Sequence, residues 1–87
     1  MTKSIFLKPY TVLTQQLIAA RTAAGLTQVE LARLLAKPQS FISKYENAER
    51  RLDVVEFLMV CRALNADPAQ ILKVIGDEFP DGSSERA

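Results

Sequence analysis

The sequence contains no histidine and only one cysteine, Cys61. A single cysteine excludes a disulfide within the chain, and without histidine the usual zinc-ligand spacings cannot form. No apolar run approaches the roughly 20 residues that span a bilayer. The longest apolar run before Pro9 has three residues, too few for a signal-peptide core. We therefore expect a cytoplasmic protein with no metal, no cofactor and no membrane contact.

The sequence also lacks the side chains that usually carry out catalysis. Imidazole is absent, and Cys61 falls on the apolar stripe of a helix expected to end at Leu64, where a cysteine acts as a small hydrophobe. No pair of carboxylates clusters in a pattern typical of general acid–base catalysis. The sequence therefore predicts a protein that is not an enzyme and has no catalytic residues.

The chain does have enough apolar material for one small domain, and its charge is uneven. Of its 87 residues, 48% are hydrophobic and 24% are charged, values typical of a globular protein. Residues 1–51 carry a net charge of +5, and residues 52–87 a net charge of −4. This asymmetry predicts a basic face that binds a polyanion.

Cap and stop signals divide the chain into short helices, with no strand pattern between them. Pro9 is expected at the first helical position. Thr27 with Glu30, and Asp53 with Glu56, match the capping-box pattern at two later helix starts. The expected helices cover residues 9–24, 27–35, 38–46, 53–64 and 68–75. We therefore predict an all-α fold, a compact five-helix bundle in one domain over residues 9–76.

The two ends of the chain differ from this domain. Residues 1–8 are expected to form an N-terminal arm, with Ser4 to Leu7 as a short extended segment. Residues 77–87 are polar and acidic and contain Pro80 and Gly82. They are therefore expected to form a frayed acidic tail.

The second and third expected helices are joined by a tight turn, as in a helix-turn-helix, whose second helix can lie in the major groove of DNA. The residues favour this reading. The runs from Arg21 to Ala32, from Pro38 to Asn47 and from Phe57 to Leu64 resemble the phage repressor/Cro, or xenobiotic-response-element, helix-turn-helix family. The resemblance covers about residues 10–75. It implies a repressor-like five-helix DNA-binding domain that acts, usually as a dimer, on palindromic operators.

The resemblance also assigns roles to residues. It makes Gln39, Ser40 and Lys44 the base-reading residues, and their chemistry agrees because Gln pairs with adenine and Lys reaches guanine. Six further residues are assigned to phosphate binding, either by the resemblance or by their position next to these residues. They are Gln28, Lys37, Ser43, Asn47, Arg50 and Arg51. Arg21 and Glu46 are implied to form a structural, partly buried ion pair beneath the DNA-binding face. The competing interpretation is that the polar residues only form a solvated helix face.

Three positions in this region leave alternatives or depart from the family pattern. Phe41 either packs against Tyr45, four residues on, or contacts a thymine methyl group. Ala36 stands where the family has a turn glycine, which costs on the order of 1 kcal/mol if its φ is positive. Ala48 replaces a second glycine, so Asn47 is expected to take the left-handed conformation instead.

The last prediction concerns partners. The helix over residues 53–64 has a second apolar stripe beyond the one its core needs, which predicts a homodimer. The expected interface residues are Val55, Leu58, Met59 and Ile75. In the competing account, Ile5 to Leu7 cover the stripe within the monomer. We thus expect a sequence-specific regulator of transcription, acting as a repressor on double-stranded DNA. The alternative is an antitoxin-like module that neutralises a protein partner and regulates its own synthesis.

Overall fold

The computed structural model describes residues 3–79, with side chains from residue 8 onward, and has five α-helices and no strand in this range. The helices are α1 (Lys3–Ala23), α2 (Gln28–Leu35), α3 (Gln39–Glu46), α4 (Val54–Leu64) and α5 (Pro68–Gly76). The predicted all-α class is confirmed. The tail expected to fray lies mostly at residues 80–87, outside the described residues.

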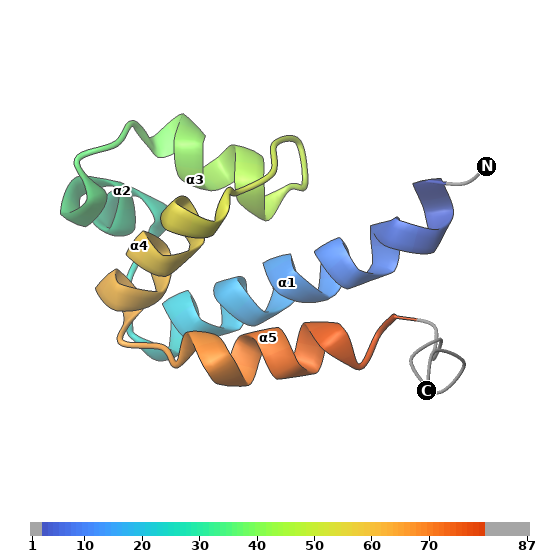
Figure 1. Ribbon diagram of the computed structural model, residues 1–87. Helices are drawn as coiled ribbons and strands as arrows, with labels where there is room; N and C mark the ends of the chain where they lie inside the picture. Colours follow the sequence, from blue (N-terminus) through green and yellow to red (C-terminus); the bar gives the residue numbers. More distant parts are fainter. Residues whose placement is uncertain (1–2, 80–87) are drawn as a thin grey trace.

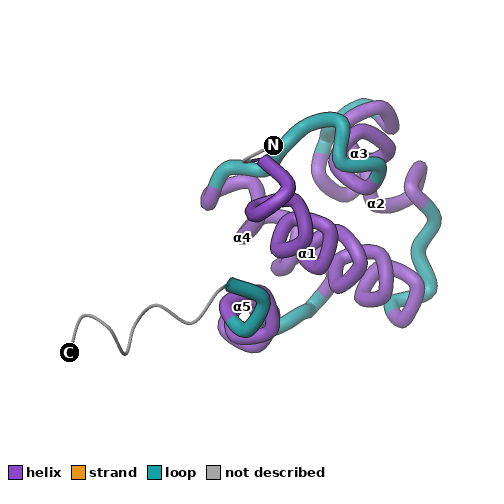
Figure 2. Tube along the Cα trace, turned by 90° about the vertical axis from the view of Figure 1, so that its right-hand side faces the viewer, coloured by secondary structure: helices purple, strands orange, loops and turns teal. Residues whose placement is uncertain are grey.

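The long helix α1 lies at the centre of the arrangement. Figures 1 and 2 show α2 and α3 above α1 and α5 beneath it, while α4 lies beside α1 at the front of Figure 1. Helix α1 packs against α3, α4 and α5, and α2 packs against α3 and α4, so α1 supports the helix pair mainly through α3. No helix within the described range is long and apolar enough to cross a membrane.

The start of α1 differs from the sequence prediction. The helix begins at Lys3 and contains Pro9 in its interior, so neither the start at Pro9 nor the extended segment over Ser4 to Leu7 is correct. Proline removes only one hydrogen bond, to the carbonyl four residues before it, and here that loss falls within the first turns of a long helix. The buried Pro9 ring and an ion pair between Lys8 and Glu78, at 3.3 Å, hold this end of α1 near the end of α5.

Side-chain caps fix the starts of α2 and α4. Thr27 accepts a hydrogen bond from the backbone N–H of Glu30, whose carboxylate accepts from the N–H of Thr27. Asp53 and Glu56 make the same reciprocal pair at α4. Each box satisfies two backbone donors that a helix start leaves unpaired. Both predicted capping boxes are confirmed.

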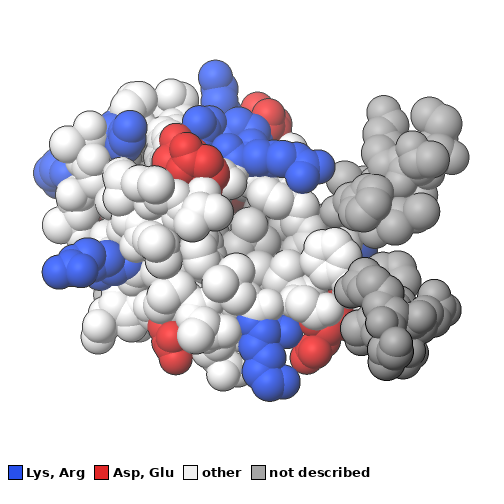
Figure 3. Space-filling view, in the orientation of Figure 1, with Lys and Arg blue, Asp and Glu red and all other residues white. Residues whose placement is uncertain are grey.

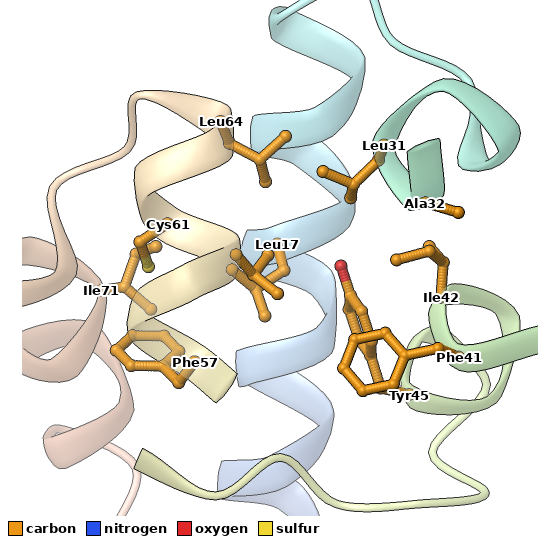
Figure 4. Close-up of a cluster of buried hydrophobic side chains, with 11 residues drawn as sticks. Leu17, Leu31, Ala32, Phe41, Ile42, Tyr45, Phe57, Cys61, Leu64 and Ile71 are labelled. Atoms are coloured by element: carbon orange, nitrogen blue, oxygen red, sulfur yellow. The ribbon is translucent and has the colours of Figure 1, made fainter. Parts of the chain in front are cut away.

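A core from all five helices joins these elements. Figure 4 shows Leu17 of α1 at its centre, with Tyr45 of α3 reaching toward it and Phe57 and Cys61 of α4 on its other side. Burial raises the pKa of the Cys61 thiol. This fits the prediction of a small, unreactive hydrophobe, since the thiolate is the reactive form.

Candidate nucleic-acid interface

The turn between α2 and α3 is short and depends on one alanine. Ala36 has φ 55° and ψ 41°, a left-handed conformation, and the N–H of Lys37 donates to the carbonyl of Ala32 at 2.9 Å. Pro38 follows in an extended conformation as the N-cap of α3 and provides no side-chain cap. Ala36 therefore adopts the positive φ for which a cost on the order of 1 kcal/mol is expected, and the turn keeps its geometry without glycine.

The loop after α3 contains the second left-handed alanine. Ala48 has φ 62°, whereas Asn47 has φ −89°. The prediction that Asn47 takes the left-handed position is therefore wrong. The carbonyls of Lys44 and Tyr45 accept hydrogen bonds from backbone N–H groups of the loop. The backbone therefore turns back toward the end of α3, and the left-handed residue that makes this turn is Ala48.

Helix α3 presents one polar and one buried face. Gln39, Ser40 and Lys44 are exposed. The opposite face is buried and comprises Phe41, Ile42, Tyr45 and Glu46. The structure thus brings the three predicted base-reading side chains together on the outer face of the second helix of the pair. Ser43 is half-buried at the edge of that face, and its hydroxyl donates to the carbonyl of Ser40 at 3.4 Å.

Beneath this face a chain of polar contacts runs from α1 to the first residue of α3. Arg21 donates from Nε and Nη2 to the two carboxylate oxygens of Glu46, at 2.8 and 3.1 Å, so the implied ion pair is present. Its Nη1 donates to the carbonyl of Leu26 at 2.8 Å. Gln28 Nε2 donates to Glu46 Oε1 at 2.8 Å, and Gln39 Nε2 donates to Gln28 Oε1 at 3.3 Å.

These contacts fix the orientation of the Gln28 amide. A carboxylate accepts but does not donate, so Glu46 can be approached only by the NH₂ side of Gln28. The Gln28 carbonyl oxygen then points toward α3 and accepts from Gln39. Hydrogen bonding with Glu46 raises the pKa of Arg21, which favours its charged form. Sequence reasoning found the ion pair but missed its extension through Gln28 to Gln39.

Phe41 packs inside the domain. Its side chain is buried, and its ring lies edge-on to that of Tyr45, with ring centres 5.7 Å apart. Lys37 Nζ lies 5.4 Å from the ring centre of Phe41, and the guanidinium carbon of Arg50 lies 4.8 Å from it. Of the two alternatives, packing against Tyr45 is the one observed. The ring thus contacts one cation that precedes α3 and one that follows it.

The two loop arginines have different partners. Arg50 donates through both Nη atoms to the carboxylate of Glu56, at 3.2 Å each, and this hydrogen bonding lowers the pKa of Glu56. Arg51 is exposed, and its guanidinium carbon lies 5.2 Å from the ring centre of Tyr10 in α1. The Tyr10 hydroxyl donates to the Arg50 carbonyl at 2.7 Å. Neither Tyr10 nor Glu56 was predicted as part of this region.

Comparison with known proteins agrees with this geometry. A helix-turn-helix family profile matches residues 17–71. The chain belongs to the Cro/C1-type helix-turn-helix family. Among solved structures, an XRE-family like protein from Pseudomonas syringae pv. tomato str. DC3000 is 51% identical, with a TM-score of 0.82, over 91% of this chain and 96% of that one. The comparison with curated proteins gives no match. Family membership places the chain among DNA-binding transcription regulators.

The charged side chains of this helix-turn-helix domain lie mostly around the edges of the face shown in Figure 3. Figure 3 shows several Lys and Arg side chains along the upper edge, over α3 and the loop that follows it, with Asp and Glu side chains among them. Other charged side chains lie at the left and lower edges, while the middle of this face is uncharged. The exposed cations of this edge include Lys37, Lys44 and Arg51. A charged edge beside an uncharged area supports different partners for the two surfaces.

The outer side of α4 contains most of the predicted interface residues. Val55 is 67% exposed and Leu58 46% exposed. With Met59, Arg62 and Pro68 they line a groove of about 490 Å³ that runs from α4 to the start of α5. We call the surface of Val55, Leu58 and Met59 the α4 patch. Ile75 does not join it, since it packs against the core and lines hollows beside Leu13 instead. The excess of apolar residues near the end of the last helix placed Ile75 with the others in the prediction, but α5 presents it to α1.

Proposed function

We propose that this chain is a sequence-specific repressor that reads the major groove of double-stranded DNA with α3. The observation that carries the proposal is the outer face of α3, where Gln39, Ser40 and Lys44 are exposed while the network of Glu46 and Gln28 holds the first of them from below. A preorganised side chain loses less conformational entropy on binding than a free one.

The orientation of Gln39 matches one base. Its Nε2 carries two hydrogens, of which one is used on Gln28. The second hydrogen and the free Oε1 form the donor and acceptor pair that fits N7 and the N6 amino group of adenine. Lys44 has no acceptor capacity and matches the O6 and N7 acceptors of guanine. Ser40 is compatible with several bases.

Phosphates would bind around this reading face. We assign them to Lys37, Ser43, Asn47 and Arg51, with Gln28 contributing its backbone N–H at the N-terminus of α2, where the helix dipole favours an anion. Arg50 is assigned as well, through the donors that Glu56 leaves unused. These contacts are independent of sequence, so they set affinity and not the preferred site.

The proposed assembly is a homodimer that joins two α4 patches. A two-fold contact buries the same apolar surface of each copy. It also makes the DNA site a palindrome, whose half-sites in this class lie about 34–36 Å apart. The apolar side chains of the α4 patch, which line one groove, support this arrangement.

Binding to DNA is tested by selecting genomic fragments on the wild-type protein and titrating the selected site with salt. We expect log K to fall with log salt by about 0.9 for each phosphate contacted. We also expect the selected fragments to share an inverted repeat that overlaps a promoter. Affinity that is constant between roughly 50 and 200 mM salt would contradict the proposal.

The oligomeric state is tested by sedimentation of the wild type, Leu58→Glu and a control, Leu72→Glu. Both leucines are exposed, but Leu72 lies on α5, outside the α4 patch. We expect a wild-type dimer, a folded Leu58→Glu monomer and a dimeric control. A wild type that stays monomeric at high micromolar concentration contradicts the dimer and favours the antitoxin-like alternative, in which the α4 patch receives another protein.

A further inference from the structure

The two consecutive arginines after α3 are presented in different ways. The guanidinium of Arg50 forms an ion pair with Glu56 at 3.2 Å and lies over Phe41. No carboxylate among residues 8–79 forms an ion pair with Arg51. The guanidinium of Arg51 lies instead over the ring of Tyr10. Arg51 therefore keeps its full charge for an external anion, whereas Arg50 shares its charge with a carboxylate.

Tyr10 contacts this loop at two points, although it lies 40 residues earlier in the sequence. Its hydroxyl fixes the backbone by donating to the Arg50 carbonyl at 2.7 Å, and its ring supports the Arg51 guanidinium. The ring is itself half-buried and borders a hollow of about 240 Å³ between α1 and the end of α5. Burial raises the pKa of Tyr10, so its hydroxyl remains a donor at neutral pH.

We propose that Tyr10 is a positioning residue of the DNA interface, which holds Arg51 in the orientation that binds a phosphate. This inference rests on the proposed function, because it assigns Arg51 to phosphate binding. The contact of a guanidinium with a ring face uses none of its N–H donors, so those donors remain available for phosphate oxygens. The hydroxyl restricts the loop, and the ring restricts the long side chain, before DNA arrives.

The test is a double-mutant cycle on duplex DNA with Tyr10→Leu, Arg51→Ala and the double variant. Tyr10→Leu removes both contacts, and we expect it to weaken binding about two- to fivefold, equally on selected and random sequences. In the Arg51→Ala background we expect the same change at residue 10 to have no further effect. Tyr10→Phe, which keeps the ring and loses the hydroxyl, is expected to fall between wild type and Tyr10→Leu.

Two controls separate positioning from general stability. Phe79→Leu changes another ring that borders the same hollow without a cation on it, and it should leave DNA affinity unchanged. Urea unfolding of each variant shows whether the domain remains folded. If Tyr10→Leu does not fold, Tyr10→Phe alone must lose affinity in the wild-type background and lose nothing in Arg51→Ala.

Different results would overturn the positioning role of Tyr10 and the proposed binding to DNA. If Arg51→Ala lowers affinity and salt dependence while both changes at Tyr10 are silent, or act equally in the two backgrounds, the positioning role is overturned and DNA binding stands. If the wild type shows no salt-dependent binding to duplex DNA, the proposed function itself fails.

Discussion

Removing Glu46 tests how strongly the reading helix depends on the network beneath it. In Glu46→Leu, the Arg21 guanidinium keeps only its bond to the Leu26 carbonyl, although its side chain is just 16% exposed. Stranding one partner of a buried ion pair costs about 3–5 kcal/mol. Because Arg21 retains some access to water and one acceptor, we expect the lower end, about 3 kcal/mol, in the free energy of unfolding by urea.

The matched variants are Arg21→Met and the double variant Arg21→Met/Glu46→Leu. Replacing both partners by apolar residues removes the stranded charge, so the double variant should be more stable than Glu46→Leu. It should still read DNA poorly, because Gln28 Nε2 has lost its acceptor and Gln39 is no longer oriented. A Glu46→Leu loss below about 1 kcal/mol, or strictly additive losses in the double variant, would refute the reasoning.

Three further predictions concern stability. Tyr45→Phe should raise the free energy of unfolding by about 1 kcal/mol, because the buried Tyr45 hydroxyl has no partner among the described residues; a loss would contradict this. Ala36→Gly should raise the free energy of unfolding by about 0.5–1 kcal/mol, because glycine adopts the positive φ without strain. The control Ala19→Gly, within α1, should lower the free energy of unfolding by about 1 kcal/mol. The pKa of Glu56 is lowered from 4.5, so its ionised form stabilises the folded state above that pH. The stability difference between wild type and Glu56→Gln should therefore shrink as pH falls below about 4.5, and a constant difference would refute the assignment.

Much of the fold is predictable because its signals are local. The capping boxes at Thr27 and Asp53 define helix starts through contacts only three residues apart, and the turn follows from the short interval before Pro38. The exposed face of α3 follows from helical spacing alone. The ion pair between Arg21 and Glu46 required the family resemblance, because nothing in the sequence spacing brings α1 to α3.

The features that were missed depend on contacts between distant segments. Nothing in the sequence connects Tyr10 with the loop after α3, and only the fold brings its ring to Arg51. Ile75 has the apolar character of an interface residue, yet α5 turns it toward α1. Pro9 was read as a helix start because proline favours that position, while the tertiary packing of α1 allows it in the interior. Helix packing, and not local propensity, decides each case.

The most direct test of the account is the discrimination of the selected DNA site by Gln39→Ala, measured against Arg51→Ala and the distant cation variant Lys73→Ala. We expect Gln39→Ala to lose about 1–3 kcal/mol on the selected site and little on random DNA, with relaxed preference at one base pair. Arg51→Ala should weaken all sequences alike, and Lys73→Ala should change neither. If Gln39→Ala and Arg51→Ala weaken selected and random DNA by the same ratio, α3 does not read the bases as proposed.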